Sequence, residues 1–355
     1  MKIAIIAPVI RKISLKNHYG GIERIIASLT IGIANNNHQI ILYAPFGTDL
    51  KHKNLKIRFT TNQDISKDTE LIKKAETNLF QKIITEQSEF DIIHTHVEPI
   101  IAKTNDDNYY DKISKPIIVT VHNQTYIDEN INYYKTHLNI HKINFVFISK
   151  DQAMPLNFLP NQTVIYNGID ISKFTFNSIP NLNQLAFLGR ITPEKGISQA
   201  IEITKLSNKK LVIGAAIDHT QQDFYDKEIK PQIDGKNIIY IGEVSDKSKN
   251  ILLRTSEALL SPIQWHEPFG LTMIEAMATG TPVIAPNIGS VSEIIINDKT
   301  GFIINDINNF NNYVEKINQI NKLDRKYCRQ IVEEKFTDKI MINNYLKLYS
   351  SIIKK

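Results

Sequence analysis

Short apolar segments rich in β-branched residues alternate along this chain with segments of helical periodicity. In the first half, helical spacing of apolar side chains covers residues 22–35 and 69–86. The apolar runs around them are residues 3–6, 39–43, 91–94, 116–121 and 145–148. This alternation predicts a parallel sheet with crossover helices, because parallel strands need a helical connection and are buried on both faces.

The same alternation starts again in the second half. A segment rich in Asn, Pro and Ser at residues 177–183 interrupts it, and a strand pattern resumes at residues 184–188. Because 355 residues exceed the usual size of one hydrophobic core, we expect two domains. The predicted fold is α/β, with two Rossmann-like lobes at residues 1–176 and 184–337, parallel sheets and a cleft between them. A last helix within residues 338–355 is expected to pack back on the first lobe.

Composition indicates which partners the chain can bind and in which compartment it works. The chain is mildly basic, with 42 Lys and Arg against 37 Asp and Glu, and its lysines are scattered. We therefore expect no nucleic-acid partner, whereas peripheral contact with an anionic membrane stays open. No stretch of about 20 apolar residues occurs, so no transmembrane helix is predicted. The one cysteine, Cys328, can form no intramolecular disulfide, which indicates a reducing compartment such as the cytoplasm.

The segment His266–Ala276, with the sequence HEPFGLTMIEA, carries the strongest indication of a ligand site. It follows a predicted strand and opens a predicted helix, whose first N–H groups suit the oxygens of a sugar or phosphate. Gly270 lets the backbone approach a ligand closely. Glu267 and Glu275 lie eight positions apart and can line one wall of a site. The alternative is that Glu267 only favours the helix dipole and that Glu275 faces solvent.

Two cations, Arg190 and Lys195, lie between another predicted strand and helix. Fixed cations stabilise the negative charge that grows on a diphosphate leaving group. This chemistry makes both residues candidates for a diphosphate site. The alternative is that Arg190 pairs with Glu194 at helical spacing and that Lys195 is merely exposed.

The first half contributes Gly20, Gly21 and His122. The glycine pair follows the first predicted strand, where backbone N–H groups can meet a phosphate or an acceptor. His122 stands just past a predicted strand, the position at which α/β folds place ligand residues, and an imidazole there can polarise a hydroxyl. The alternatives are an ordinary strand-to-helix turn for the glycines and a satisfied core histidine for His122.

Together these motifs resemble the retaining GT-B glycosyltransferases of family four. The resemblance runs in matching order over essentially the whole chain, and five ordered motifs are far more specific than any one of them. The motifs are Gly20-Gly21, Val121-His122-Asn123, Tyr166-Asn167-Gly168-Ile169-Asp170, Gly189-Arg190 with Lys195-Gly196, and Glu267-Pro268-Phe269-Gly270 ending in Glu275.

The resemblance implies roles for the matching residues. Arg190 and Lys195 would bind the donor diphosphate, Glu275 the ribose and Glu267 the sugar hydroxyls. The remaining donor contacts would come from the backbone of Phe269, Gly270 and Leu271, from Gly20 and Gly21 on the other lobe, and from Val244 beside the base. His122 would lie near the sugar and the acceptor, so the implied catalytic set is His122, Glu267, Arg190 and Lys195. Bulky Trp265 departs from the small residues expected at its position, which leaves the identity of the donor open.

The implied reaction is retaining, metal-independent transfer of a hexose from a nucleotide-diphosphate sugar to an acceptor hydroxyl. A UDP-sugar is favoured over GDP-mannose. No Asp-x-Asp occurs to hold a divalent cation, so Arg190 and Lys195 are expected to replace a metal, and no cofactor is predicted. The alternatives are a sugar-nucleotide epimerase or phosphorylase of the same architecture, and a binding protein without turnover.

The acceptor stays open among saccharides, lipids and small molecules. Its contacts are expected from loops of the first lobe, at residues 46–53, 97–108 and 124–134, because loops vary with function. The sequence is compatible with a monomer or a homodimer.

Overall fold

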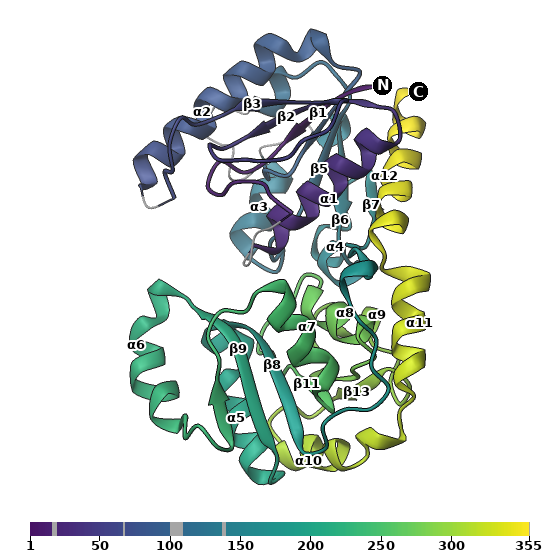
Figure 1. The fold of residues 1–355 in the computed structure, drawn as a ribbon. Coiled ribbons are helices and arrows are strands. Elements are labelled where there is room, and N and C mark those ends of the chain that lie inside the picture. Colours follow the sequence, from purple (N-terminus) through teal and green to yellow (C-terminus); the bar gives the residue numbers. More distant parts are fainter. Residues whose placement is uncertain (16–19, 67, 100–108, 137–139, 355) are drawn as a thin grey trace. The chain divides into compact units, whose positions relative to one another are not determined.

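The computed structural model describes residues 1–15, 20–66, 68–99, 109–136 and 140–354. The chain folds as two compact units (Figure 1). One unit consists of Met1–Gly168 together with Asp338–Lys355, and the other consists of Ile169–Thr337.

The first unit is built on a seven-stranded sheet in the order β3-β2-β1-β4-β5-β6-β7, with every neighbouring pair parallel. Its central strands are buried along their whole length, as expected for a parallel sheet covered on both faces. The strands are β1 Lys2–Ile6, β2 Gln39–Ala44, β3 Leu55–Phe59, β4 Ile92–Thr95, β5 Ile117–Val121, β6 Ile143–Phe147 and β7 Gln162–Val164. The helices are α1 Gly21–Asn35, α2 Thr69–Glu86, α3 Asp128–Thr136, α4 Lys150–Ala153 and α12 Asp338–Ile353.

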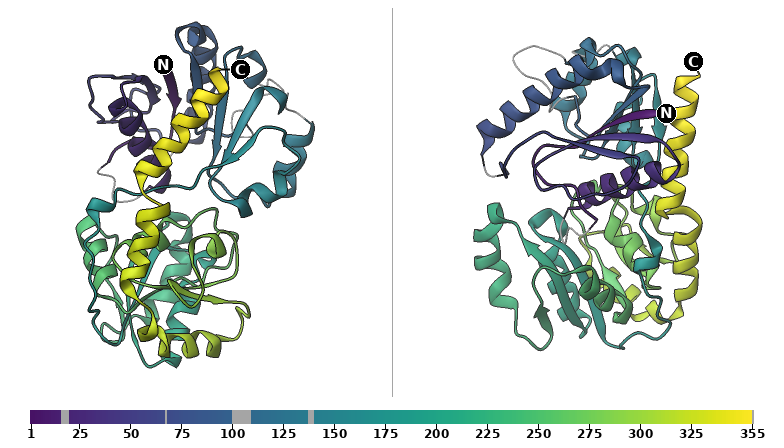
Figure 2. Two further views of the ribbon diagram at one scale, coloured as in Figure 1. Left: turned by 90° about the vertical axis from the view of Figure 1, so that its right-hand side faces the viewer. Right: turned by 45° about the horizontal axis from the view of Figure 1, so that its top comes forward.

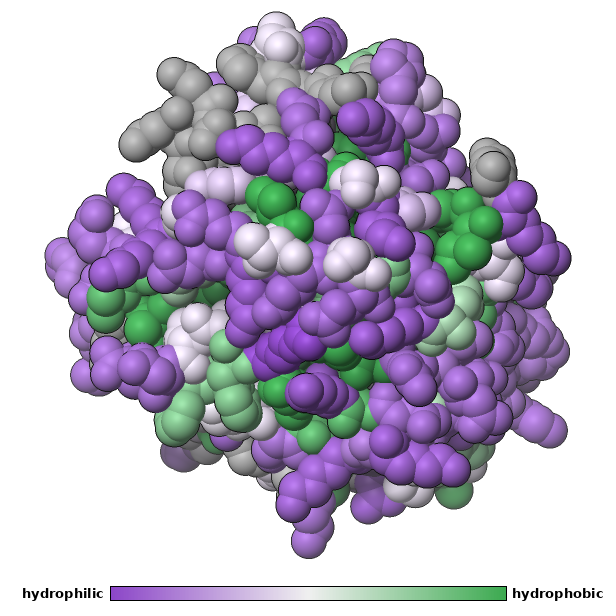
Figure 3. Space-filling model, turned by 90° about the horizontal axis from the view of Figure 1, so that it is seen from above, coloured by the Kyte–Doolittle hydropathy of each residue, from purple (hydrophilic) through white to green (hydrophobic). Residues whose placement is uncertain are grey.

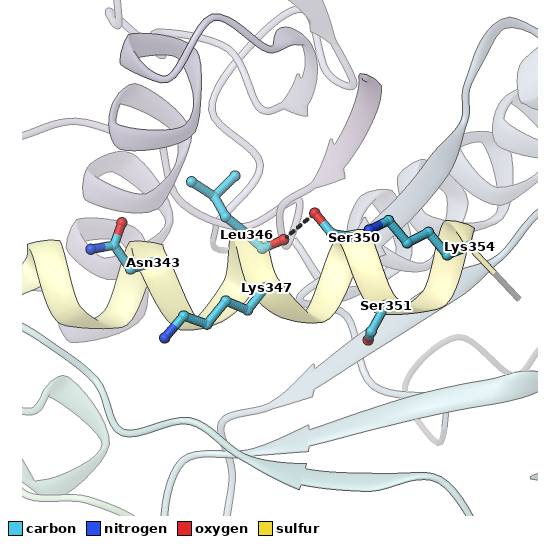
Figure 4. A pocket seen from close by; sticks show the side chains of 6 residues that line it. All are labelled: Asn343, Leu346, Lys347, Ser350, Ser351 and Lys354. Carbon is cyan, nitrogen blue, oxygen red and sulfur yellow. Dashed lines mark hydrogen bonds between the residues drawn. The ribbon is translucent and has the colours of Figure 1, made fainter.

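Helix α12 completes the first unit although it comes from the far end of the sequence. It packs against α1, where a side chain in place of Gly32 would meet Ile342 (Figure 2). Tyr345 and Tyr349 on the inner face of α12 are buried. The opposite face carries a shallow pocket (Figure 4), lined by Asn343, Leu346, Lys347, Ser350, Ser351 and Lys354.

The second unit is built on a six-stranded parallel sheet in the order β10-β9-β8-β11-β12-β13. The strands are β8 Gln184–Ile191, β9 Lys210–Ile217, β10 Ile238–Tyr240, β11 Ala258–Leu260, β12 Val283–Pro286 and β13 Gly301–Ile304. The helices are α5 Ile197–Leu206, α6 Gln222–Phe224, α7 Asp246–Thr255, α8 Leu271–Ala278, α9 Val291–Ile294, α10 Phe310–Asn318 and α11 Arg325–Lys335.

Each sheet has a point at which the order of the strands reverses. In the first unit β1 lies between β2 and β4, and in the second unit β8 lies between β9 and β11. Residues that follow the carboxyl ends of such strands meet at one edge of the sheet, which is where open α/β sheets bind ligands. In the second unit the reversal brings together the residues after β8 and β11. In the first unit β5 lies beside β4, so the residues after these two strands also meet at that edge.

Three features of the fold differ from the sequence-based expectation. Residues 169–176, expected in the first lobe, belong to the second unit. The segment predicted as a linker, residues 177–183, is held within the second unit, since the Asn177 N–H donates to the Thr279 carbonyl at 3.0 Å. Strands β3 and β7 were not expected. Both are only partly buried, and β3 alternates charged with apolar residues, so neither has the continuous apolar run of a central strand.

The face of the molecule seen in Figure 3 is mostly hydrophilic, and its apolar residues form small, separate patches. Scattered apolar residues of this kind are normal for a protein surface. Within the described ranges, no helix is long and apolar enough to cross a membrane.

Candidate active site

The second unit brings Lys195 and Glu267 together although they are 72 positions apart in the sequence. Lys195 ends the short helical turn Pro193–Lys195 after β8, and Glu267 lies in the loop after β11. The Lys195 ammonium forms an ion pair with Glu267 Oε2, and the side chains are 19% and 17% exposed. Lys195 is therefore paired and largely buried, so the alternative that it is merely exposed is wrong, while its contact with a diphosphate stays a prediction.

Trp265 contacts both members of this ion pair. Its indole N–H donates to Glu267 Oε2 at 3.0 Å, and the Lys195 ammonium lies 4.6 Å from the centroid of its ring. The ring thus holds both members of the pair, through a hydrogen bond on one side and a cation–π contact on the other.

Arg190 is held by two carboxylates at the end of β8. Its Nη1 donates to Asp218 Oδ2 at 3.0 Å, and its Nη2 lies 3.6 Å from Glu194 Oε1. The Glu194 contact is the one that the helical-spacing alternative proposed, whereas Asp218 was not foreseen. Donation from the Thr220 hydroxyl and N–H, followed by the charge of Arg190, holds the pKa of Asp218 below its usual value.

Glu275 lies on α8 and is buried, so the alternative that it faces solvent is wrong. Its Oε1 accepts from the Lys249 ammonium at 2.5 Å, and the two side chains are 9% and 8% exposed. Lys249 was missed in the sequence. Its spacing to Leu252 and Leu253, three and four positions on in α7, places it on the apolar face of that helix and was the available signal.

The loop that carries Glu267 is fixed to its surroundings. Ser290 donates through Oγ to the Phe269 carbonyl at 2.7 Å and through its N–H to the Glu267 carbonyl at 3.1 Å. Gly270, just before α8, has a φ of 83°, and a Cβ there would lie 2.1 Å from Met273 Cε. Glycine is therefore required where the loop turns into the helix.

The remaining donor-side candidates lie around this loop and α7. The Phe269 side chain is buried and packs edge-on against Phe336, so only its backbone is placed to meet a ligand. Leu271 begins α8 and is partly buried. Val244 is buried next to the start of α7, and its contact with the base stays a prediction.

In the first unit His122 follows β5 and lies beside His96, which follows β4. Their Nε2 and Nδ1 atoms are 2.9 Å apart, and His122 is 8% exposed. Glu98 Oε1 accepts from the N–H groups of His122 and Asn123 at 3.1 and 3.0 Å. Burial lowers the pKa of His122 to about 4 and that of His96 well below its ordinary value, so both imidazoles are neutral at pH 7.

A further layer of hydrogen bonds supports His96 from the core. The ring of His94 lies 4.4 Å from that of His96, centroid to centroid. His94 Nδ1 is 2.6 Å from the Tyr349 hydroxyl and its Nε2 is 2.7 Å from the Thr120 hydroxyl. Burial, with a smaller contribution from the charge of His122, lowers the pKa of His94 to about 3. The available sequence signal was the His-x-His pattern at the end of β4, next to the strand that carries His122.

The glycine pair lies at the start of α1. Gly20 has a φ of 120°, and a Cβ there would lie 2.4 Å from Glu23 Oε2, so this position also requires glycine. Gly21 is the first residue of α1. Contact of this pair with phosphate stays a prediction, and so does the acceptor role of the loop 97–108, of which residues 100–108 lie outside the described part of the chain.

Among the described residues, no group of three or more His, Cys, Asp or Glu side chains could hold a metal ion. The metal-independent reaction and the absence of a cofactor stay predictions.

Comparison with known proteins relates the second unit to one family. Residues 169–337 match the family described as Glycosyl transferases group 1. A glycogen synthase from Mycobacterium tuberculosis is 32% identical over 39% of this chain. That match spans 35% of the synthase. An uncharacterized 41.2 kDa protein from the cps region of Klebsiella pneumoniae is 29% identical over 53% of this chain, and the match spans 54% of that protein. The chain thus spans about half, or less, of the length of these curated relatives.

Solved structures extend the similarity to the whole fold. Sucrose-phosphate synthase from Thermosynechococcus elongatus has a TM-score of 0.82 at 15% identity and covers 100% of both chains. HepE from Anabaena, solved in complex with UDP and glucose, has a TM-score of 0.74 at 18% identity over 99% of this chain and 100% of its own. The predicted fold of two parallel-sheet α/β lobes is confirmed.

Proposed function

Residues 169–337 belong to the group 1 glycosyltransferases, and on this premise we propose that the chain transfers a hexose from a nucleotide-diphosphate sugar to an acceptor hydroxyl with retention. The match and the fold confirm the resemblance to GT-B glycosyltransferases that the motifs indicated. The observation that carries the proposal is the cluster of Arg190, Lys195 and Glu267 at the carboxyl ends of β8 and β11.

The two cations of this cluster are suited to the donor diphosphate. Arg190 and Lys195 are each held by carboxylates, so their positions are set before a ligand arrives. A diphosphate gains negative charge as the glycosidic bond breaks, and cations already in place stabilise that charge without reorganising. In this proposal they do the work of a metal ion.

The carboxylates are suited to hydroxyl groups, which donate hydrogen bonds to them. Glu267 is assigned to the sugar and Glu275 to the ribose, with Val244 beside the base. The N–H groups of Phe269, Gly270 and Leu271, at the start of α8, are assigned to sugar and phosphate oxygens. A UDP-sugar is favoured over GDP-mannose, and the UDP and glucose bound to the structural neighbour HepE support that preference.

On the first unit, His122 and the glycines Gly20 and Gly21 are assigned to the sugar, the acceptor and the phosphate. The acceptor hydroxyl would attack from the face that the nucleotide leaves, and a donor phosphate oxygen would take its proton. The acceptor is a saccharide, a lipid or a small molecule. The buried single cysteine, Cys328, supports a reducing, cytoplasmic setting, where peripheral membrane contact would serve a lipid acceptor.

The first experiment measures which nucleotide the protein binds. Melting temperatures are recorded with UDP, GDP, ADP and their sugar conjugates, with and without magnesium, because a ligand that binds only the folded state raises the melting temperature. We expect a selective shift by UDP compounds that magnesium does not change. The absence of a shift with any nucleotide would contradict the diphosphate site.

Variants then locate the binding site and separate binding from turnover. Lys195→Ala and Arg190→Ala should weaken UDP binding and slow UDP release from UDP-glucose by about 10²- to 10³-fold. Lys227→Ala, which removes an exposed ion pair of the same unit, is the matched control and should change neither. His122→Ala and Glu267→Ala should slow turnover far more than they weaken UDP binding. Release of glucose with inverted anomeric configuration, followed by proton NMR, would contradict retention.

A further inference from the structure

His96 is the middle member of a group of three neighbouring histidine rings in the first unit, called the histidine stack below. It lies between His94, 4.4 Å away by ring centroid, and His122, 5.2 Å away. His96 is 3% exposed and His94 is fully buried, whereas His122 keeps 8% exposure. Of the three, His122 is therefore the one with access to a ligand, and the other two lie behind it.

The stack is held at its inner end by side chains from the core. The Tyr349 and Thr120 hydroxyls lie within hydrogen-bonding distance of the two nitrogens of His94. Tyr345 lies 3.0 Å from the Thr120 hydroxyl. Because α12 supplies both tyrosines, the position of His94, and of the His96 ring beside it, is set by packing of the unit and not by a ligand.

The contact between His96 and His122 controls the chemistry of the outer ring. A neutral imidazole has one N–H and one lone pair, so a partner at one nitrogen decides what the other nitrogen offers. His96 Nδ1 lies 2.9 Å from His122 Nε2, so these two nitrogens share a hydrogen bond. Nδ1 of His122 is then left for a ligand, either as a donor or as an acceptor according to the direction of that hydrogen bond.

The backbone of His122 is fixed from the same segment of the chain. Glu98, two residues after His96, accepts from the N–H groups of His122 and Asn123 and from the Asn123 side-chain amide at 2.9 Å. Residues 96–98 therefore hold both the backbone and the ring of His122 from the end of β4.

The geometry points to His96 as a positioning residue for His122, which fixes its ring orientation and its tautomer for sugar transfer. This inference rests on the proposed function, because the role of His122 does. The arrangement follows the general pattern in which a group that acts on the substrate is oriented by a second side chain behind it.

The test compares His96→Leu with His96→Asn. Leucine removes the hydrogen bond, while the Asn amide places a polar atom near the position of Nδ1. We expect His96→Leu to lower kcat for UDP-glucose turnover by about 10- to 100-fold, as for a misplaced catalytic group, with KM for UDP-glucose little changed. His96→Asn should recover most of that loss. His141→Leu, which replaces an exposed histidine of the same unit, is the matched control and should behave as the unmodified protein.

Nitrogen-15 NMR of the histidine rings supplies a readout that does not need turnover. The unmodified protein should show one tautomer for His122, and His96→Leu should show a mixture. An unchanged His122 tautomer in His96→Leu, or equal losses of kcat in both variants, would overturn the inference. If leucine prevents folding, His96→Ala, which also removes the hydrogen bond, replaces it in the NMR test and should show the same mixture of His122 tautomers. Failure of the protein to turn over any nucleotide-sugar would refute the proposed function instead, while the NMR result would still report on the contact between the two histidines.

Discussion

The two units place very different chemistry at the carboxyl ends of neighbouring strands. In the first unit the residues after β4 and β5 form a neutral histidine stack that is almost completely buried. In the second unit the residues after β8 and β11 form ion pairs, whose side chains keep between 17% and 35% exposure. Burying a neutral group costs little free energy when its hydrogen bonds are kept. Burying a charge costs more, because a partner only partly replaces the lost hydration. The parallel sheet thus sets the place of a site, and the charge of its residues sets how deeply it is buried.

Lys249 and Glu275 are the exception in the second unit, because both charged side chains are buried, at 8% and 9% exposure. Replacing Lys249 with Met should leave the Glu275 carboxylate without its partner and lower the free energy of unfolding by about 3 to 5 kcal/mol. Urea unfolding followed by circular dichroism measures this loss. The double variant Lys249→Met with Glu275→Leu should recover a large part of it.

Lys195→Met is the matched control for the influence of burial, because its pair with Glu267 is more exposed and Trp265 still donates to Glu267. Its loss of stability should be clearly smaller than that of Lys249→Met. Equal losses would show that burial does not distinguish the two ion pairs.

Mild acid should affect the first unit more than the second. Burial depresses the pKa of His94 to about 3 and of His122 to about 4, with His96 also lowered, so the folded state holds all three neutral while the unfolded state protonates near pH 6.5. The contribution of these neutral histidines to the free energy of unfolding is therefore complete above pH 6.5 and is lost as the pH falls from there towards 4. Between pH 7 and pH 6 the expected loss is about 0.7 kcal/mol per histidine, or about 2 kcal/mol for the three.

Hydrogen exchange of backbone amides can assign this acid effect to a unit. Amides of β4 and β5 should lose protection between pH 7 and pH 6, after correction for intrinsic exchange, while those of β11 and β12 should change less. Equal loss in both sheets would contradict the contrast between a neutral and a charged cluster.

The smallest effect is expected at Trp265, which belongs to the charged cluster but is itself neutral. Trp265→Phe removes the indole N–H that donates to Glu267 and retains a ring near the Lys195 ammonium. The loss of transition-state stabilisation should be about 1.5 kcal/mol, which lowers kcat/KM for UDP-glucose about tenfold. Trp265→Leu also removes the cation–π contact and should lose more. Identical kinetics for the two variants would mean that the ring itself contributes nothing.

The sequence by itself determined the alternation of strands and helices and the positions of the strongest candidate residues. Apolar periodicity reports which faces of a helix are buried, so α2 was predicted with the bounds that the structure shows, and α12 was predicted within residues 338–355, where it lies. Lys195 and Glu267 were predicted to follow strands, as the structure shows, because functional side chains of α/β folds lie at carboxyl ends of strands. Arg190 was also predicted after a strand but lies within β8, next to its last residue.

Only the tertiary structure decided which of these residues meet and which others support them. Lys195 and Glu267 are 72 positions apart, Lys249 and Glu275 are 26 apart, and His94 and Tyr349 are 255 apart. Such pairs depend on strand order and on the return of α12 to the first sheet, which local periodicity does not encode. The physical reason is that hydrogen bonds and ion pairs require side-chain atoms within a few ångströms of one another, and that proximity is created only when both sheets have assembled.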